Sequence, residues 1–397
     1  MSATTFMQAK VGGLPRPFWA LWGGTLVNRL GTVVAPFIGV YLTQSRGLSV
    51  TDAGLVLGVY GAGTVASQLV AGALTDRIGR RATLSGGMLA TAATLLALGY
   101  STTMPTLLAS MFLLGLVIDV YRPASSALVA DLISPQDRPR AYGLLFWAIN
   151  LGYAVGMTAG GRLAEMGFTL LFWIDAVSSV IFAVLVWRAV PETRPERVRS
   201  GGFGEVLRDR LMVVFTLLTV AHALVYLQTV TMLPVAMVEA GLTKSEFGLA
   251  MALNGVLIVI VQPLVSDLLT RYDLARAEAL GLAVMGVGFG LTAFATSTLG
   301  LAGTIAVWTF GEIITAGVGG TIVATLAPAH LRGRYNGLYG LSWAVAMVLA
   351  PTLGGVLLGV SSQALWFTVA GIGLLAAAGT LAIGPAIRRR AAALTEH

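Results

Sequence analysis

This chain contains twelve apolar runs. Each is long enough to cross the hydrocarbon core of a membrane as a helix, for which about 20 residues are needed. Charged, proline or glycine breaks place the runs at 18–44, 51–75, 82–100, 105–133, 141–161, 168–188, 211–238, 246–270, 277–296, 299–328, 335–358 and 364–385. Only 11% of the residues are charged, whereas a soluble domain has about 25%. The pattern predicts an all-α integral membrane protein with 12 transmembrane helices.

The basic residues predict how these spans are oriented. Of the 25 Lys and Arg residues, 20 lie in the termini and even-numbered loops, and three lie in odd-numbered loops (Arg46, Arg162 and Lys244). Cytoplasmic loops carry the excess of Lys and Arg, so both termini are expected in the cytoplasm. The net charge of +7 then follows from topology, and no nucleic-acid partner is expected. The first run follows a mixed N-terminal segment and is interpreted as a membrane helix, not a cleaved signal.

An internal repeat relates the two parts of the chain on either side of its longest connection. That connection divides an N-terminal six-helix half (1–188) from a C-terminal half (211–397), with a cytoplasmic linker at 189–210. At an offset of about 194 residues, GLSVTDAGL (47–55) matches GLTKSEFGL (241–249), and MTAGG (157–161) matches PTLGG (351–355). Repeats related about an axis along the membrane normal are typical of major facilitator transporters, which place the substrate site between two pseudo-symmetric halves.

The loop between the second and third runs, GALTDRIGRR, resembles motif A of the major facilitator superfamily. The matching positions are Gly72, Asp76, Arg77, Gly79, Arg80 and Arg81. The resemblance implies an ion pair of Arg80 with Asp131, at the cytoplasmic end of the fourth run, and places Asp76 near the start of the eleventh. We interpret the motif as a latch for the outward-facing state. The alternative is that its charges only enforce topology.

The fifth run is similar to the antiporter signature, motif C, of proton-coupled drug exporters. Met157 stands where that signature has proline, and its glycines correspond to Gly152, Gly156, Gly160 and Gly161. Small residues at this spacing form a flat face suited to a tight crossing between the halves, and ordinary helix packing is the alternative. Together with TFGEIITAG (309–317) and FWAINLG (146–152), these motifs resemble the drug:proton antiporter branch, LmrP-type exporters in particular.

The resemblance covers essentially the whole chain, and it implies a fold, an activity and a location. It implies a monomeric exporter in a bacterial-type cytoplasmic (inner) membrane, driven by the proton gradient without a cofactor, and not an enzyme. LmrP-type exporters have an acidic residue in span ten that takes part in proton coupling and cation recognition, and Glu312 is the residue at that place. In the family, spans one, four, seven and ten line the central cavity.

Five ionisable residues lie near the middle of those four runs: Arg29, Asp119, Arg122, His222 and Glu312. Such residues inside a membrane usually face inward, pair with one another and act in function. Arginine keeps its proton, whereas a carboxyl group removed from water accepts one more readily. Glu312 and Asp119 are therefore the expected proton carriers. Asp119 and Arg122 can pair on one helix face, so Glu312 is preferred, and a structural ion pair with Arg29 or Arg122 is the alternative for Asp119.

The repeat places the two carboxyl groups at matching positions of the two halves. The offset of 193 residues that aligns Pro135 with Pro328 also carries Asp119 onto Glu312. The expected cavity lining combines cations, polar groups and an aromatic wall for amphiphiles or cations: Arg29, Arg122, His222, Asn28, Tyr121, Tyr226 and Trp308. Hydrogen-bonded lining is the alternative for the histidine, and packing or interface anchoring is the alternative for the aromatic residues.

Other classes of function remain open or are excluded. The chain has no cysteine, which excludes disulfides and Cys-based metal sites, and no metal site is expected. It has no P-loop, so an ATP-driven pump would need a partner chain. The runner-up is a proton symporter or facilitator for a polar or anionic metabolite held by Arg29 and Arg122, because arginine suits bidentate anion recognition. A sensor or scaffold without transport is a further class.

Overall fold

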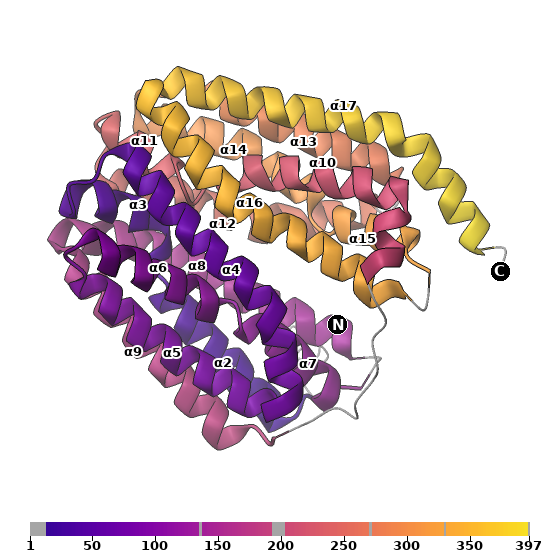
Figure 1. Cartoon of the computed structure of the whole chain (residues 1–397), viewed down its shortest axis with the longest axis horizontal. Helices are drawn as coiled ribbons and strands as arrows, with labels where there is room; N and C mark the ends of the chain where they lie inside the picture. Colours follow the sequence, from indigo (N-terminus) through magenta and orange to yellow (C-terminus); the bar gives the residue numbers. More distant parts are fainter. Residues whose placement is uncertain (1–12, 135–136, 193–202, 270–271, 329–330, 396–397) are drawn as a thin grey trace, which may run out of the picture.

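Each of the twelve expected spans is helical in the computed structural model of the chain (Figure 1). The structure describes residues 13–134, 137–192, 203–269, 272–328 and 331–395, and no strand occurs among them. Ten helical segments in this part of the chain are long and apolar enough to cross a membrane, so the all-α membrane architecture is confirmed. Eight spans are single helices: α4 (Val50–Ile78), α5 (Arg80–Tyr100), α8 (Arg138–Met166), α9 (Phe168–Ala189), α12 (Lys244–Leu269), α13 (Leu274–Thr292), α16 (Arg332–Val360) and α17 (Ser362–Thr395).

The first, fourth, seventh and tenth spans are each broken. They comprise α2 (Arg16–Gly31) with η1 (Ala35–Phe37), α3 (Ile38–Val40) and η2 (Tyr41–Ser45); α6 (Met104–Ile118) with α7 (Tyr121–Leu132); α10 (Arg210–Leu227) with α11 (Leu233–Glu239); and α14 (Thr298–Thr315) with α15 (Val318–Leu326). Irregular backbone at membrane depth is tolerated only where it is buried in protein or lines a water-filled cavity. The breaks therefore mark these four spans as the central ones.

The sequence contains a physical cause for each break. Proline lacks an N–H group, and its ring clashes with the carbonyl four residues earlier. Pro36, Pro123 and Pro234 follow the interrupted turns of the first, fourth and seventh spans at this distance or close to it. In the tenth span, Gly317 has φ +79°, a left-handed conformation that glycine adopts at little cost. The first of these breaks comes one turn after Arg29, and the last comes shortly after Glu312.

The two halves cross at two sites that follow the sequence repeat. Where α4 meets α16, a Cβ atom added to Gly54 would lie 2.9 Å from the Cα atom of Gly355. Where α12 meets α8, a Cβ atom added to Gly248 would lie 3.3 Å from the Cα atom of Gly161. Gly54 and Gly248 are 194 residues apart, as are Gly161 and Gly355. Glycine lets the backbones approach closely, so the repeat builds two equivalent crossings.

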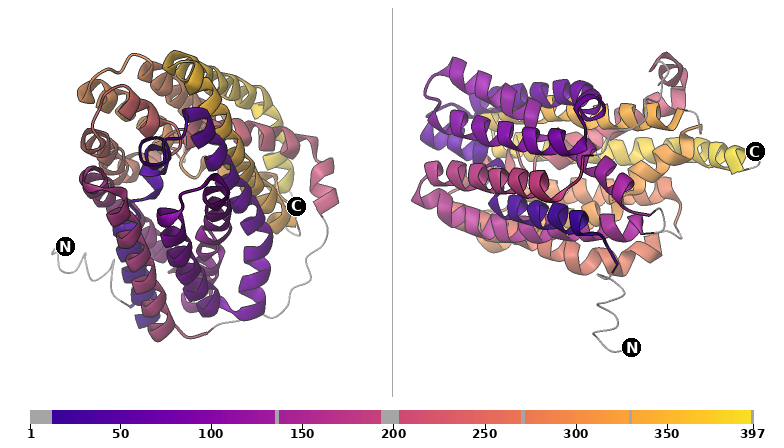
Figure 2. Two further views of the ribbon diagram at one scale, coloured as in Figure 1. Left: turned by 60° about the vertical axis from the view of Figure 1, so that its left-hand side comes forward. Right: turned by 90° about the horizontal axis from the view of Figure 1, so that it is seen from below.

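The halves are joined at one end of the bundle and separate at the other. We call the end with the turns at 46–49, 101–103, 167, 240–243, 293–297 and 361 the odd-loop end, and the end with both termini the terminal end. Near the odd-loop end, one apolar core contains residues of both halves, and the Phe37 ring packs edge-on against Phe247 at 5.7 Å. Two further cores, one around Phe18 and one around Tyr335, each contain residues of a single half. Figures 1 and 2 show the ribbons diverging toward the terminal end.

The described parts of the linker are attached to the half that each adjoins. Glu192 contacts the start of α5 in the N-terminal half. At the other end of the linker lies a short 3-10 helix, η3 (Phe203–Arg208). Asp209, directly after it, accepts hydrogen bonds from Tyr335 (2.6 Å) and Arg390 (3.1 Å). The linker thus starts on one half and ends on the other.

Candidate functional site

Three helices of the C-terminal half meet at the Glu312 carboxyl group. Glu312 lies on α14, and its Oε2 atom accepts a hydrogen bond of 2.8 Å from the Asn254 amide of α12. The Tyr226 hydroxyl of α10 is also hydrogen-bonded to this carboxyl group. The Asn254 amide donates a second bond, of 3.0 Å, to the Thr309 hydroxyl one turn earlier on α14. Both donors are neutral, so they orient the carboxyl group without supplying a countercharge.

A second polar cluster lies beside the first and contains an acid that the sequence interpretation did not single out. The Nδ1 atom of His222 lies 2.9 Å from the Oε1 atom of Glu278, which is on α13, and both side chains are buried. The Trp343 ring packs against the rings of His222 (5.6 Å) and Tyr226 (5.5 Å). His222 therefore joins two acidic neighbourhoods, because the Glu312 carboxyl group also interacts with it electrostatically.

The polar groups inside the N-terminal half lie around Arg29. Its guanidinium group lies 5.2 Å from the centre of the Tyr121 ring, in cation–π contact. Asp175 of α9 is within electrostatic reach of Arg29 and accepts a hydrogen bond from the Val34 backbone at the break of the first span. Asp175 is 5% exposed. A buried carboxylate needs such partners, because an uncompensated charge in an apolar interior is costly.

Asp119 occupies a different place in its span from that of Glu312. It is the residue at which α6 ends, and it lies at the junction with α7. Glu312 lies within α14, four residues before the corresponding junction at Ala316. The positional equivalence predicted from the repeat therefore does not extend to the local backbone, because Pro123 interrupts the fourth span at Asp119. The Arg122 side chain lies outside those that the structure describes.

Two residues predicted to line the cavity are packing residues in the structure. The amide of Asn28 donates a hydrogen bond of 3.1 Å to the Ser179 hydroxyl of α9, and Asn28 is buried. Trp308 is 1% exposed and stacks on the Phe289 ring of α13 at 5.5 Å. Both side chains point into helix–helix contacts here, and their contact with substrate stays a prediction. When a helix is apolar on every side, its sequence does not reveal which face turns to the cavity and which packs against other helices.

The motif A loop brings Arg80 to Asp131, as the family resemblance implied. The Arg80 Nε atom lies 3.0 Å from Asp131 Oδ2, and the Arg80 side chain is 7% exposed. Both residues belong to the N-terminal half, so this pair is present while the halves are apart at the terminal end. A latch across the halves was predicted for Asp76. The side chains of Asp76, Gly72 and Arg77 lie outside those that the structure describes.

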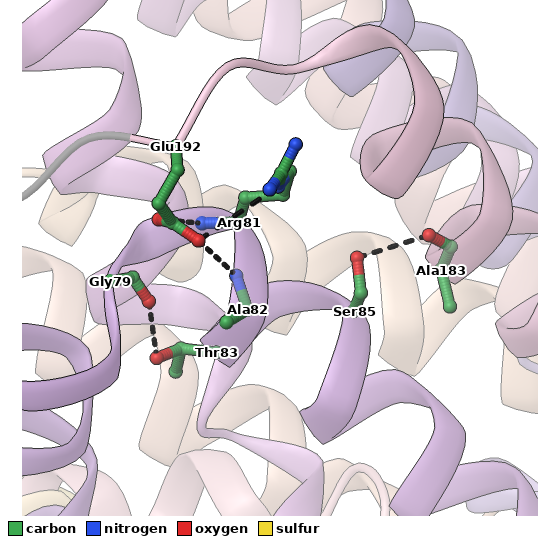
Figure 3. A network of polar contacts seen from close by, with 7 residues as sticks. All are labelled: Gly79, Arg81, Ala82, Thr83, Ser85, Ala183 and Glu192. Atoms are coloured by element: carbon green, nitrogen blue, oxygen red, sulfur yellow. Dashed lines mark hydrogen bonds and ion pairs between the residues drawn. The ribbon is translucent and has the colours of Figure 1, made fainter.

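Figure 3 shows an additional anion at the motif A loop that the sequence interpretation missed. The Glu192 carboxylate accepts hydrogen bonds from the backbone N–H groups of Arg81 (3.0 Å) and Ala82 (3.1 Å) at the start of α5. A helix N-terminus favours a negative charge. The Arg81 guanidinium also packs over the Trp187 ring at 4.7 Å. Gly79, with φ +100°, lies against Glu192, where an added Cβ atom would clash.

The glycines of motif C pack mainly within their own half. A Cβ atom added to Gly152 would clash with Arg29, one on Gly156 would lie 3.2 Å from the Arg29 carbonyl oxygen, and one on Gly160 would lie 3.1 Å from Phe37. Only Gly161 of the four meets the other half, at the start of α12. The expected crossing between the halves thus applies to one glycine. Gly152 and Gly156 let α8 approach α2 closely beside Arg29, and Gly160 lies against Phe37 of η1.

The residues missed by sequence reasoning share one property. Glu278 and Glu192 lie close to the ends of apolar runs, where charges are ordinarily interfacial. The acidic residue in ARAEAL (275–280) was the available signal for Glu278, but its burial depends on packing against His222. Among the described residues, no group of His, Asp and Glu could hold a metal ion.

Comparisons with known proteins place this arrangement in a large group of carriers. The family model described as Major Facilitator Superfamily matches residues 21–351 and 223–395. The chain is 29% identical to the multidrug resistance protein MdtH of Cronobacter sakazakii over 327 residues, covering 81% of each chain. It is 27% identical to the uncharacterized MFS-type transporter YttB of Bacillus subtilis over 353 residues, covering 87% of this chain and 89% of that one.

Solved structures share the fold at lower sequence identity. A peptide transporter POT in complex with sulfate superposes with a TM-score of 0.80 at 18% identity, covering 98% of this chain and 99% of the other. The nucleoside transporter NupG superposes with a TM-score of 0.79 at 13% identity, covering 92% and 99%. These likenesses support the arrangement of helices and carry no information on the substrate.

Proposed function

The chain belongs to the Major Facilitator Superfamily, and from this premise we propose that it is a proton-coupled exporter of small amphiphilic or cationic compounds. The observation that carries the proposal is the setting of Glu312: a carboxyl group on a broken central span, held by the neutral groups of Asn254 and Tyr226. Such a group can exchange a proton for a cationic substrate. The named multidrug resistance relatives at 26–29% identity support the same class.

The orientation of the bundle gives the proposal a direction. The terminal end carries the excess of basic residues, so it faces the cytoplasm by the positive-inside rule. The halves meet at the odd-loop end, which supports assigning the structure to the inward-facing state of a carrier in a bacterial inner membrane. Substrate then enters from the cytoplasm or the inner leaflet and meets ionised Glu312. Rocking of the halves exposes the site outward, where protons replace the substrate.

The alternative, uptake of an anionic metabolite, depends on Arg29. Its guanidinium group lies on the Tyr121 ring, and Asp175 is an acidic neighbour. An arginine already associated with a carboxylate is a weaker anion receptor than one facing an open cavity. The geometry therefore favours cation export over anion import. No cofactor or catalytic step enters the proposal, and the working unit is taken to be a monomer driven by the proton gradient.

Reconstitution into liposomes tests the function directly. Vesicles with the terminal end outside and an acidic lumen are given ethidium, a lipophilic cation, or a fluorescent organic anion. The proposal predicts that ethidium accumulates against its gradient and that a protonophore abolishes accumulation. Release of a preloaded organic anion from the acidic lumen together with protons, combined with no ethidium transport, would establish the alternative. Flux of neither compound would favour a sensor or scaffold.

A further inference from the structure

The His222–Glu278 pair is buried and stands apart from the proposed proton carrier. The His222 side chain is 9% exposed and that of Glu278 is 5% exposed. The second carboxylate oxygen of Glu278, Oε2, is buried and has no hydrogen-bond partner in the part of the chain that the structure describes. A purely structural polar pair would be expected to satisfy both oxygens, because each orphaned buried group costs about 1–3 kcal/mol.

The charge of this pair depends on a single proton. With one proton shared between Nδ1 of His222 and Oε1 of Glu278, the pair is neutral overall, whichever atom holds it. Removing that proton leaves one net negative charge, and adding another to Oε2 leaves one net positive charge. Both of these states are unfavourable in a buried site without a countercharge. The pair is therefore suited to hold one proton and to respond to nearby changes in charge.

The site lies close enough to Glu312 for such a response. Glu278 and Glu312 are on α13 and α14, which cross where a Cβ atom added to Gly281 would lie 2.8 Å from the Gly311 carbonyl oxygen. Gly281 follows Glu278 by one turn, and Gly311 directly precedes Glu312. On the facing side, Trp343 packs against both His222 and Tyr226, and Tyr226 is hydrogen-bonded to Glu312.

Few other titratable groups face the pair from the helices around it. Tyr339 of α16 interacts electrostatically with Glu278, and Glu312 of α14 interacts with His222. The sequence of α15 has no charged residue. On α17, Arg388 and Arg390 are bound to Asp273 (3.1 Å) and Asp209 (3.1 Å) near the terminal end. The charge nearest to the pair that can change is thus that of Glu312.

We propose that His222 and Glu278 form a second proton-binding site, with the proton shared between Nδ1 and Oε1 and coupled electrostatically to the proton on Glu312. Two carboxyl groups that share a region of low dielectric titrate as a coupled system. Loss of the shared proton makes ionisation of Glu312 less favourable, so the two sites exchange protons in sequence. This inference deepens the proposed function and rests on it for its role in transport.

Proton binding without substrate tests the site itself. Purified protein in detergent with a pH-indicator dye is shifted from about pH 9 to about pH 6, a range in which exposed carboxylates stay ionised. Glu278→Gln, His222→Asn and the double variant should each take up about one proton fewer than wild type, without additivity. The exposed-site control Glu205→Gln should match wild type. Unchanged uptake in either single variant, or an additive loss of two, would overturn the proposal.

One further variant and one further measurement keep the test decisive. Glu278→Asp retains a carboxyl group and should take up the same number of protons as wild type, which separates loss of the proton from loss of folding. In ethidium-loaded vesicles, Glu278→Gln should lower the steady-state gradient about tenfold for each unit of pH gradient, the factor lost with one coupled proton. If wild type builds no gradient, the proposed function fails, while the proton count still decides the site. A gradient unchanged in Glu278→Gln would contradict the coupling.

Discussion

In the N-terminal half the buried carboxylate of Asp175 lies within reach of the Arg29 guanidinium, whereas in the C-terminal half Glu312 is held by the Asn254 amide and the Tyr226 hydroxyl. A cation stabilises an ionised carboxylate, so Arg29 offsets part of the cost of burying a charge on Asp175. Neutral donors orient a carboxyl group without supplying a countercharge, so compensation of the Glu312 charge depends on His222, with which it interacts electrostatically. Two halves built from one repeat have therefore come to hold their acids in different ways.

The same contrast distinguishes the candidate proton carriers. Asp119 lies where Pro123 interrupts the fourth span, while Glu312 lies within α14, before the interruption at Gly317. A carboxyl group inside a helix keeps its position as the span bends beyond it. We infer that the N-terminal half supplies the rigid reference and that the C-terminal half supplies the exchangeable charge. The following substitutions test this contrast, from the largest expected effect to the smallest.

Removing the Arg29 guanidinium group from the N-terminal half should lower the stability of the fold. In Arg29→Ala, the buried Asp175 carboxylate loses its cationic neighbour, and we expect a destabilisation of about 2–5 kcal/mol. Thermal unfolding in detergent measures it. Adding Asp175→Asn should restore part of the loss, because the uncompensated charge is then gone. If the double variant is no more stable than Arg29→Ala alone, Asp175 is not the group that Arg29 stabilises.

Removing the amide that holds Glu312 should affect coupling more than stability. Asn254→Ala deletes the 2.8 Å hydrogen bond to the carboxyl group and the 3.0 Å bond to Thr309. A hydrogen bond to a charged group contributes about 1.5–3 kcal/mol, so we expect the rate of pH-driven ethidium export to fall about tenfold or more. Asn28→Ala, which removes a buried amide in the other half, is the matched control. Equal losses in the two variants would argue against a special role for the C-terminal half.

A smaller effect is expected from the hydroxyl of Tyr226. Tyr226→Phe keeps the ring on Trp343 and removes only the hydrogen bond to Glu312. We expect export to fall about fivefold, which corresponds to about 1 kcal/mol. Tyr121→Phe keeps the ring beneath Arg29, so export by this variant should stay close to wild type. A larger effect from Tyr121→Phe would reverse the assignment of roles to the halves.

The smallest effect is predicted at Trp308, whose packing in the structure differs from the cavity-facing position expected from the sequence. Its ring stacks on Phe289 inside the helix packing, so Trp308→Phe should leave the order of preference among cationic substrates unchanged, as measured by competition with ethidium. Altered selectivity would mean that Trp308 contacts substrate after all.

The sequence was sufficient to predict where the helices lie, but it was insufficient to predict which side of each helix faces the interior. Apolar runs and turn residues located twelve helical stretches, since length and hydropathy are local properties. In the described part of the chain, ten segments are long and apolar enough to cross a membrane. The breaks are visible in Pro36, Pro123 and Pro234, although only the fold shows that they share the central spans. Glu278 was overlooked and the packing of Trp308 on Phe289 was not foreseen, because burial and direction depend on helix tilt and neighbours. In a chain this apolar, sequence periodicity carries little of that information.

The central claim is that Glu312 carries the exchangeable proton, and separating exchange from uphill transport tests it most directly. In liposomes, Glu312→Gln should still exchange ethidium across the membrane when no pH gradient is imposed, but it should lose accumulation driven by a pH gradient. Asp119→Asn should keep a substantial part of that accumulation. Wild-type accumulation by Glu312→Gln, or its complete loss in Asp119→Asn alone, would contradict the account.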